Sequence, residues 1–190
     1  MSLNLKNKIK SALAYIRVLA ILPGVRWKDE KFKKDLLRWK RQACLMCGDK
    51  MAFAILLLEY REFRNLFIYR NRFRGLYRRW VSLWYKPMDT LYIQAKEIGG
   101  GLFIQHGFAT MISAEYIGEN CWINQQVTIG YSNKGDRPPT IGDNVMITCG
   151  AKVLGPVTVG NDAIIGANAV VIHDVESGAV MGGVPAKRIK

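Results

Sequence analysis

Two histidines, His106 and His173, are candidates for proton transfer in this chain. The ordinary pKa of histidine is about 6.5, so its neutral imidazole can accept a proton from a hydroxyl group near neutral pH. His106 lies beside an irregular coil of the repeat described below, whereas His173 follows the last repeats at a predicted corner and is expected to be exposed. His106 is therefore the candidate general base, and a structural histidine in a turn or core is the alternative.

Metal ligands are few. Cys44 and Cys47 form a single Cys-x-x-Cys with no second pair and no histidine nearby. They could supply at most two of the four ligands that a structural zinc needs, so we expect them to pack within a helical segment and expect no metal site.

A six-residue repeat must position His106. Between Ile117 and Val175 an isoleucine or valine recurs at every sixth position, with one interruption. A small or medium side chain follows four residues later in each unbroken hexad, and glycine with asparagine or aspartate often comes between them. The aliphatic positions are Ile117, Ile123, Ile129, Ile141, Ile147, Val153, Val159, Ile165 and Val171, and the second positions are Cys121, Val127, Val145, Ala151, Val157, Ala163, Ala169 and Val175.

Six residues allow a short strand and a corner, and a sixfold period is typical of a parallel β-helix. Glycine and asparagine suit the corners because they tolerate positive φ. The alternative, an antiparallel sandwich, needs turns every 8 to 12 residues. We therefore predict a mainly β fold, with both repeated positions directed inward, over residues 88–190.

Two irregularities interrupt the repeat. Ile98 and Ile104 keep the six-residue step, with Leu102 and Phe108 at the second inward position, but Ile104 and Ile117 are 13 residues apart. One extra residue must therefore bulge out of a coil next to His106. Residues 130–140 carry charged residues and two prolines, which predicts a loop that leaves the β-helix.

Residues 1–87 have a different character. They hold 21 of the 28 basic residues and only 6 of the 15 acidic ones, whereas residues 88–190 have a net charge of −2. Apolar spacing predicts helices over 4–22, 28–46 and 49–69, and aromatic and basic side chains alternate over 60–86. We predict a basic, aromatic-rich helical domain. The alternating stretch fits an amphipathic helix packed on the β-helix, a membrane-surface contact, or single-stranded nucleic acid.

We expect no cleavable signal sequence, and the sequence has no apolar run of the roughly 20 residues that a bilayer span needs. Four cysteines do not form a disulfide framework at this length, and Cys121 falls on an inward position. These features predict a cytoplasmic protein, with the inner face of the membrane as one location.

The β part resembles the hexapeptide-repeat acyltransferases, particularly serine acetyltransferases and the O-acetyltransferases of surface polysaccharides. The likeness rests on four segments, Ile98-Gly-Gly-Gly-Leu-Phe-Ile-Gln-His106-Gly, Val127-Thr-Ile-Gly130, Gly135-Asp-Arg-Pro-Pro-Thr-Ile-Gly142 and Gly182-Gly-Val-Pro-Ala-Lys187. It implies a left-handed parallel β-helix with an α-helical N-terminal extension, and a homotrimer with active sites between subunits.

The resemblance also implies an acetyl-CoA-dependent O-acetyltransferase with His106 as its base. Gly130, Cys149 and Ala167 match positions that touch CoA, Lys187 fits a contact to its phosphates, and Trp122 is a candidate subunit or ligand contact. Asp136 and Arg137 match substrate-binding loop residues.

Departures from serine acetyltransferases concern the acceptor. An aspartate and a histidine of that family correspond to Leu91 and Ile93, and a loop histidine corresponds to Pro138. Because a buried zwitterion needs charged partners, we expect a sugar hydroxyl of a surface-polysaccharide precursor as acceptor. L-serine is the alternative, and a non-catalytic scaffold whose basic domain binds nucleic acid is a third interpretation, which we do not favour. Asp89, Glu97 and Glu115 are candidates for orienting His106.

Overall fold

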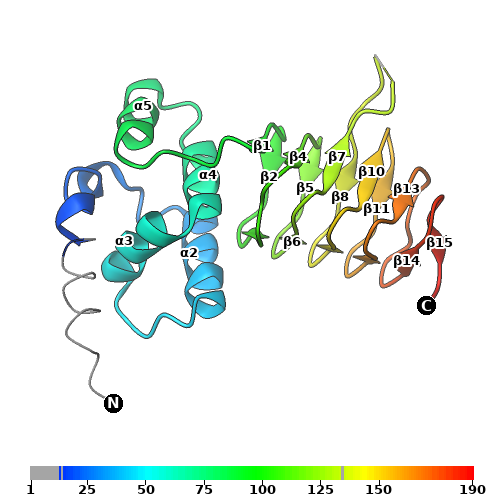
Figure 1. The fold of residues 1–190 in the computed structure, drawn as a ribbon, viewed down its shortest axis with the longest axis horizontal. Coiled ribbons are helices and arrows are strands. Elements are labelled where there is room, and N and C mark those ends of the chain that lie inside the picture. The colour runs from blue at the N-terminus through cyan, green and yellow to red at the C-terminus, as the bar shows by residue number, and fades with distance from the viewer. Residues whose placement is uncertain (1–12, 14, 134) are drawn as a thin grey trace. The chain divides into compact units, whose positions relative to one another are not determined.

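The computed structural model describes residues 13, 15–133 and 135–190, and the chain divides into two compact units, Met1–Pro87 and Met88–Lys190. Figure 1 shows helices in the first unit and stacked strands in the second. Among the described helices, none is long and apolar enough to cross a membrane.

Within the described residues, the first unit contains a short 3-10 helix, η1 (Leu22–Gly24), and four α-helices that follow it. These are α2 (Glu30–Gln42), α3 (Asp49–Glu59), α4 (Arg61–Arg70) and α5 (Gly75–Trp84). Of the helix predicted over residues 4–22, residues 1–12 and 14 lie outside the described residues, while Leu13 and residues 15–18 are helical. Cys44 and Cys47 lie in the connection between α2 and α3, so the expectation that they pack within a helix is wrong.

The single helix predicted over residues 49–69 is also wrong, because the chain breaks at Tyr60 (φ −112°, ψ 102°). The guanidinium of Arg64 donates to the carbonyls of Leu57 and Leu58 at 2.6 and 2.7 Å. These are carbonyls at the end of α3 that lack helical partners, and their bonds to Arg64 fix the end of the helix. A second break, at residues 71–74, separates α4 from α5.

An aromatic cluster forms the core of the helical unit. Neighbouring ring centroids lie 5.0 to 6.0 Å apart, mostly edge to face, in the set Trp27, Phe32, Phe53, Phe63 and Phe67. Two of these rings, Phe63 and Phe67, come from the alternating stretch 60–86. The interpretation that its aromatics pack on the β-helix is therefore wrong for these two, whose partners lie within the helical unit.

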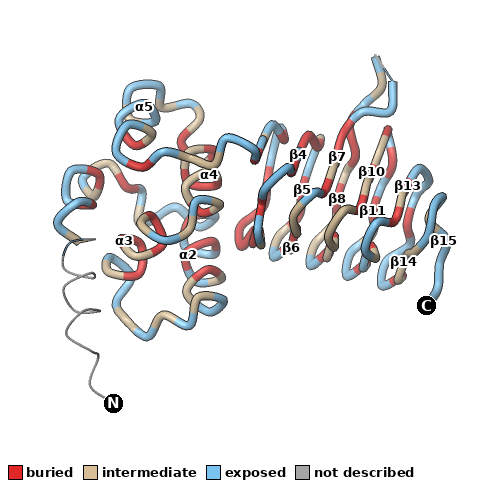
Figure 2. The backbone as a smooth tube through the Cα atoms, viewed as in Figure 1, coloured by how far each residue is buried: buried red, intermediate tan, exposed pale blue. Residues whose placement is uncertain are grey.

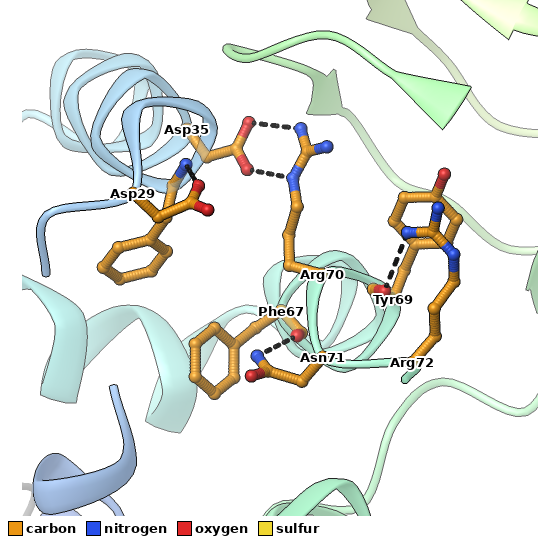
Figure 3. Close-up of polar contacts among 8 residues, drawn as sticks. Asp29, Asp35, Phe67, Tyr69, Arg70, Asn71 and Arg72 are labelled. Atoms are coloured by element: carbon orange, nitrogen blue, oxygen red, sulfur yellow. Dashed lines mark hydrogen bonds and ion pairs between the residues drawn. The ribbon is translucent and has the colours of Figure 1, made fainter. Parts of the chain in front are cut away.

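A buried ion pair ties α2 to α4 (Figure 3). Nε and an Nη of Arg70 donate to the two carboxylate oxygens of Asp35 at 2.7 and 3.1 Å, and Asp35 is almost fully buried. Six residues before Asp35, Asp29 caps α2 by accepting a hydrogen bond from the backbone N–H of Phe32 at 2.9 Å. The helical unit is thus held by polar contacts as well as by its aromatic core.

The second unit is a parallel β-helix, as predicted, with short strands in three sheets (Figure 1). Its hand, from the family likeness, is left-handed. The first sheet, called sheet A here, contains β1 (Leu91–Ile93), β4 (Thr110–Ile112), β7 (Thr128–Gly130), β10 (Lys152–Leu154) and β13 (Val170–Val171). Sheet B contains β2 (Glu97–Ile98), β5 (Tyr116–Ile117), β8 (Thr140–Ile141) and β11 (Thr158–Val159).

Sheet C contains β3 (Phe103–Ile104), β6 (Trp122–Ile123), β9 (Met146–Ile147), β12 (Ile164–Ile165), β14 (Val180–Gly182) and β15 (Lys187–Arg188). Among the strand pairs of the described residues, β14 and β15 are antiparallel and the others are parallel. The chain visits sheets A, B and C in turn, so each circuit makes one coil.

The interior follows the predicted register. All nine aliphatic positions and all eight second positions are buried, as the buried bands of Figure 2 illustrate. Leu102 is also fully buried, but Phe108 is 47% exposed, so its predicted inward placement is wrong. The corner that contains Phe108 holds more residues than a regular hexad does, and this moves Phe108 out of the stack.

The predicted corner chemistry is observed. Asn120, Asn144, Asp162 and Asn168 have φ between 55° and 60°, in the left-handed region that asparagine and aspartate tolerate. Residues 131–133 and 135–139 leave the β-helix between β7 and β8 as a projecting loop, also as predicted (Figure 1). The stacked coils thus form a rigid support for one enlarged corner and one loop.

Candidate functional site

His106 lies in an enlarged corner between β3 and β4. Ile104 and Ile112 are eight residues apart, but the residues with which they pair in the next coil, Ile123 and Ile129, are six apart. The corner therefore holds two extra residues. The following step, from Ile112 to Ile117, takes five residues, one fewer than the regular hexad, so the net excess over this span is the one residue that the sequence revealed.

The side chain of His106 is exposed, and its backbone has a φ of 55°. Within the described residues, no hydrogen bond or ion pair involves its ring. An open hollow of about 410 Å³ lies beside this corner and reaches its last residues, Ala109 and Thr110. The hollow is lined by Thr90, Tyr92, Ala109, Thr110, Met111 and Thr128. Its lining is mainly apolar, with hydroxyl groups and no charged side chain.

Only one of the three acidic residues considered for orienting His106 lies near this corner. Asp89 immediately precedes Thr90, whose carbonyl accepts from the N–H of Thr110 at 3.1 Å. Glu115 follows the opposite end of strand β4, between sheets A and B, where it pairs with Lys96 at 2.7 Å. Glu97 lies in sheet B. Asp89 is therefore the acidic candidate that the fold favours.

Cys149 and Ala167 lie in the same column of corners as His106. Backbone hydrogen bonds of 2.9 to 3.0 Å join successive corners. The N–H of Gln126 donates to the carbonyl of Phe108, the N–H of Gly150 to the carbonyl of Gln125, and the N–H of Asn168 to the carbonyl of Cys149. These bonds stack the corners after β3, β6, β9 and β12. We call this column the C–A edge, because each corner leads from sheet C to sheet A. Cys149 is half-buried and Ala167 is exposed.

Lys187 lies at the far end of the C–A edge. After β14 the chain turns through residues 183–186. The carbonyl of Gly183 accepts from the N–H of Val170 at 3.0 Å, and the N–H of Ala186 donates to the carbonyl of Val170 at 2.8 Å. Lys187 then pairs with Gly182 and is exposed. With about 4.8 Å per coil, the four coil steps from His106 to this turn cover roughly 19 Å.

Gly130, Asp136 and Arg137 lie at a different edge, where sheet A leads to sheet B. Gly130 ends β7, and an added Cβ would meet no atom within 4 Å. Arg137 is exposed and lines a smaller hollow of about 100 Å³ that also touches Glu115. Within one chain, His106, Cys149, Ala167 and Lys187 thus share the C–A edge. The other three predicted site residues lie at the edge between sheets A and B.

Asp136 holds the projecting loop. Its carboxylate accepts from the hydroxyl of Ser132 and, at 3.0 Å, from the N–H of Asn133. These bonds, that of Ser132 most of all, lower the pKa of Asp136. The carboxylate of Asp136 therefore stabilises the conformation of the loop from within.

The residues that line the hollow were not among those predicted from the sequence to belong to a site. Tyr92, Met111 and Thr128 occupy matching outward positions of sheet A, in register across β1, β4 and β7. Alternation from the inward residues Ile93, Ile112 and Ile129 could have identified these outward neighbours. The hollow itself depends on the enlarged corner, whose size the net spacing conceals.

Comparison with known proteins places the β-helix. Residues 138–173 match the family described as "Bacterial transferase hexapeptide (six repeats)". A serine acetyltransferase of Helicobacter pylori is 46% identical over 96 residues, which cover 49% of this chain and 56% of that protein. One from Staphylococcus xylosus is 45% identical over 97 residues, or 50% of this chain and 45% of that protein. The chain thus spans about half the length of the curated relatives that it matches.

Solved structures extend the likeness beyond the β part. The serine acetyltransferase of Neisseria gonorrhoeae in complex with serine has a TM-score of 0.65 at 26% identity, with 93% of this chain and 82% of that chain covered. A serine acetyltransferase in complex with CoA has a TM-score of 0.64 at 27% identity, with 94% and 73% covered. The helical unit followed by the β-helix is thus an arrangement that these structures share.

Proposed function

We propose that this chain, which carries a hexapeptide repeat and is similar to serine acetyltransferases, transfers an acetyl group from acetyl-CoA to a hydroxyl group. The observation that carries this proposal is the alignment of His106, Cys149, Ala167 and Lys187 on the C–A edge. This line of stacked corners, roughly 19 Å long, suits the extended pantetheine arm, with the thioester beside His106 and the phosphates near Lys187.

His106 acts as the general base in this proposal. Its neutral imidazole takes the proton of the acceptor hydroxyl as that oxygen attacks the thioester carbonyl carbon. The tetrahedral intermediate carries a negative charge on the former carbonyl oxygen, which backbone N–H groups of the corner would stabilise. The intermediate collapses with loss of the CoA thiolate, which takes up a proton, and the acetyl ester is released. The chemistry requires only acetyl-CoA and the acceptor.

L-serine is the acceptor that the comparisons favour. The relatives reported above are serine acetyltransferases, and one of the similar structures holds serine. This reverses the order given by the sequence, which placed a sugar hydroxyl first. A sugar acceptor is kept as the second candidate because the hollow at the enlarged corner has no charged side chain in its lining, and a zwitterion in it would need charged partners.

A second copy of the chain would complete the site. The loop with Asp136 and Arg137 and the corner with His106 belong to different edges of one β-helix. In a trimer, the loop of one subunit could reach the C–A edge of the next, which supports a homotrimer with shared sites. Light scattering of the purified chain should give the mass of three chains, and a monomer at working concentration would contradict the shared site.

Release of free CoA thiol tests the activity. The protein should cleave acetyl-CoA faster when an acceptor is added, and mass spectrometry should find the acetyl group on that acceptor. L-serine is tested against D-serine as its matched control, and monosaccharides and oligosaccharides form the second arm. Acceptor-dependent cleavage with sugars alone would select the second candidate. Failure to bind acetyl-CoA in calorimetry would contradict the proposal as a whole.

A further inference from the structure

Helix α5 has an apolar face that the helical unit leaves exposed. Leu76, Trp80, Leu83 and Trp84 follow each other at steps of four, three and one residues, so they share one side of the helix. Leu76 is 85% and Leu83 77% exposed, and Phe73, just before the helix, is 87% exposed. We call these five residues the α5 face.

The adjoining side of α5 attaches the helix to its own unit. Val81 is buried, and the hydroxyl of Tyr77 donates to the carbonyl of Ile21 at 2.9 Å. Within the α5 face, Trp80 is also anchored, because its Nε1 donates to the carbonyl of Ala20 at 3.1 Å and its ring lies 5.8 Å from that of Trp84, edge to face. The core therefore accounts for one side of the helix, and the α5 face is presented on a firmly held element.

The surroundings of the α5 face are basic. Between Glu62 and Asp89 the sequence has no acidic residue and seven arginines and lysines, of which Arg70 is in the buried pair with Asp35 and Arg64 binds the end of α3. Arg79 is exposed and stands three residues after Leu76 and four before Leu83, so it borders the face. The guanidinium of Arg72 lies 4.5 Å from the ring centroid of Phe73. Exposed aromatic and aliphatic groups are thus combined with positive charge.

We propose that the α5 face docks on the surface of a bilayer that contains anionic lipids. A ten-residue helix is too short to span a membrane, but an amphipathic helix with basic and aromatic residues can lie in the headgroup region. A second copy fits less well, because residues 1–87 carry 21 basic and 6 acidic residues and two such units would repel each other. Tryptophan at the edge of the face suits the boundary between headgroups and acyl chains. The proposal is independent of the proposed function.

Vesicle sedimentation with the full chain tests this proposal. The protein should bind vesicles of phosphatidylcholine mixed with phosphatidylglycerol, and bind pure phosphatidylcholine weakly. The double variant Leu76→Ser/Leu83→Ser should lower the partition coefficient by about tenfold or more. Its matched control, Leu37→Ser/Met46→Ser, removes two other exposed apolar side chains of the same unit and should bind as the wild type does.

A charge pair gives an independent readout if the double variant does not fold. Arg79→Glu should lower binding to the anionic vesicles about fivefold or more, whereas Arg41→Glu, an equal charge change at the end of α2, should have a smaller effect. Added salt should weaken wild-type binding.

Four results would overturn the proposal. The first is no binding of the wild type to anionic vesicles, and the second is an equal loss of binding in each variant and its control. The third is loss of self-association, measured without vesicles, in Leu76→Ser/Leu83→Ser. The fourth is binding of a single-stranded oligonucleotide that depends on the α5 face as strongly as vesicle binding does. The third result would assign the face to a second copy, and the fourth would assign it to nucleic acid.

Discussion

His106 and Ala109 lie three residues apart in the enlarged corner, and both have a left-handed backbone, with φ of 55° and 51°. This conformation costs a residue that has a Cβ atom about 1–2 kcal/mol, and both His106 and Ala109 have one, unlike glycine. The corner is therefore a strained element supported by regular coils, and it presents the candidate base outside the packed interior.

Substitutions of Ala109 test this backbone strain. Ala109→Gly should leave the free energy of unfolding within about 1 kcal/mol of the wild type, because relief of strain offsets the greater entropy of the unfolded glycine chain. Ala109→Val should lower it by about 1–2 kcal/mol, because a β-branched residue resists positive φ. Urea unfolding provides the measurement. Ala167→Val is the control at an exposed corner alanine without positive φ, and an equal cost at both sites would refute the strain.

The Asp35–Arg70 pair should be required for the helical unit. Asp35→Ala removes the carboxylate from a nearly buried guanidinium, so unfolding should become easier by about 3–5 kcal/mol. Glu30→Ala breaks the exposed pair with Lys33 and should cost less than about 1 kcal/mol. Both values come from urea unfolding at neutral pH. A cost for Asp35→Ala as small as that of Glu30→Ala would show that the buried pair is dispensable.

Tyr77 should make the helical unit sensitive to high pH. Burial raises the pKa of Tyr77 from 10.0 to about 12. The fold favours the neutral phenol, so this contribution is complete below the unfolded pKa and is lost as pH rises through the folded one. The free energy of unfolding should fall more steeply between pH 10 and 12 in the wild type than in Tyr77→Phe. Tyr131→Phe, in the exposed loop, should retain the wild-type slope, and identical slopes in all three proteins would contradict this prediction.

Ala167 tests the C–A edge as a CoA groove. Ala167→Phe places a bulky ring at an exposed corner position, so stability should change by less than about 0.5 kcal/mol. If the pantetheine arm passes this corner, the dissociation constant for CoA should rise about tenfold or more. A tenfold rise corresponds to a loss of about 1.4 kcal/mol of binding free energy. Calorimetric titration with CoA measures this. Ser177→Phe, at an exposed corner position outside the C–A edge and likewise without positive φ, should bind CoA normally, and equal affinities of the two variants would place the CoA contact elsewhere.

Much of the β-helix could be predicted because its interior has a strict rule. An inward position needs an aliphatic or small side chain, and the six-residue step marks it from Ile117 to Val171. Phe108 escaped the rule because two extra residues in one corner and one residue fewer in the next give a net excess of one. Spacing records only this net value, so the sequence located the irregularity but not its size or the hollow beside it.

The helical unit shows a different limit. Apolar periodicity continues across Tyr60, so the sequence could not show that the helix ends there. The break depends on Arg64, a residue of the next helix, whose guanidinium binds the carbonyls of Leu57 and Leu58. Similarly, the alternating aromatic and basic pattern did not distinguish the interior ring of Phe63 from the exposed side chain of Phe73, because their positions depend on tertiary packing.

The steady-state kinetics of His106→Ala most directly test the central claim, that the enlarged corner carries the general base of an acetyl transfer. With acetyl-CoA and an acceptor that the wild type uses, kcat should fall by about 10² to 10⁴, while the dissociation constant for CoA stays within about twofold of the wild type. His173→Ala, at the other exposed histidine, should retain wild-type kinetics. Full activity of His106→Ala would contradict the account.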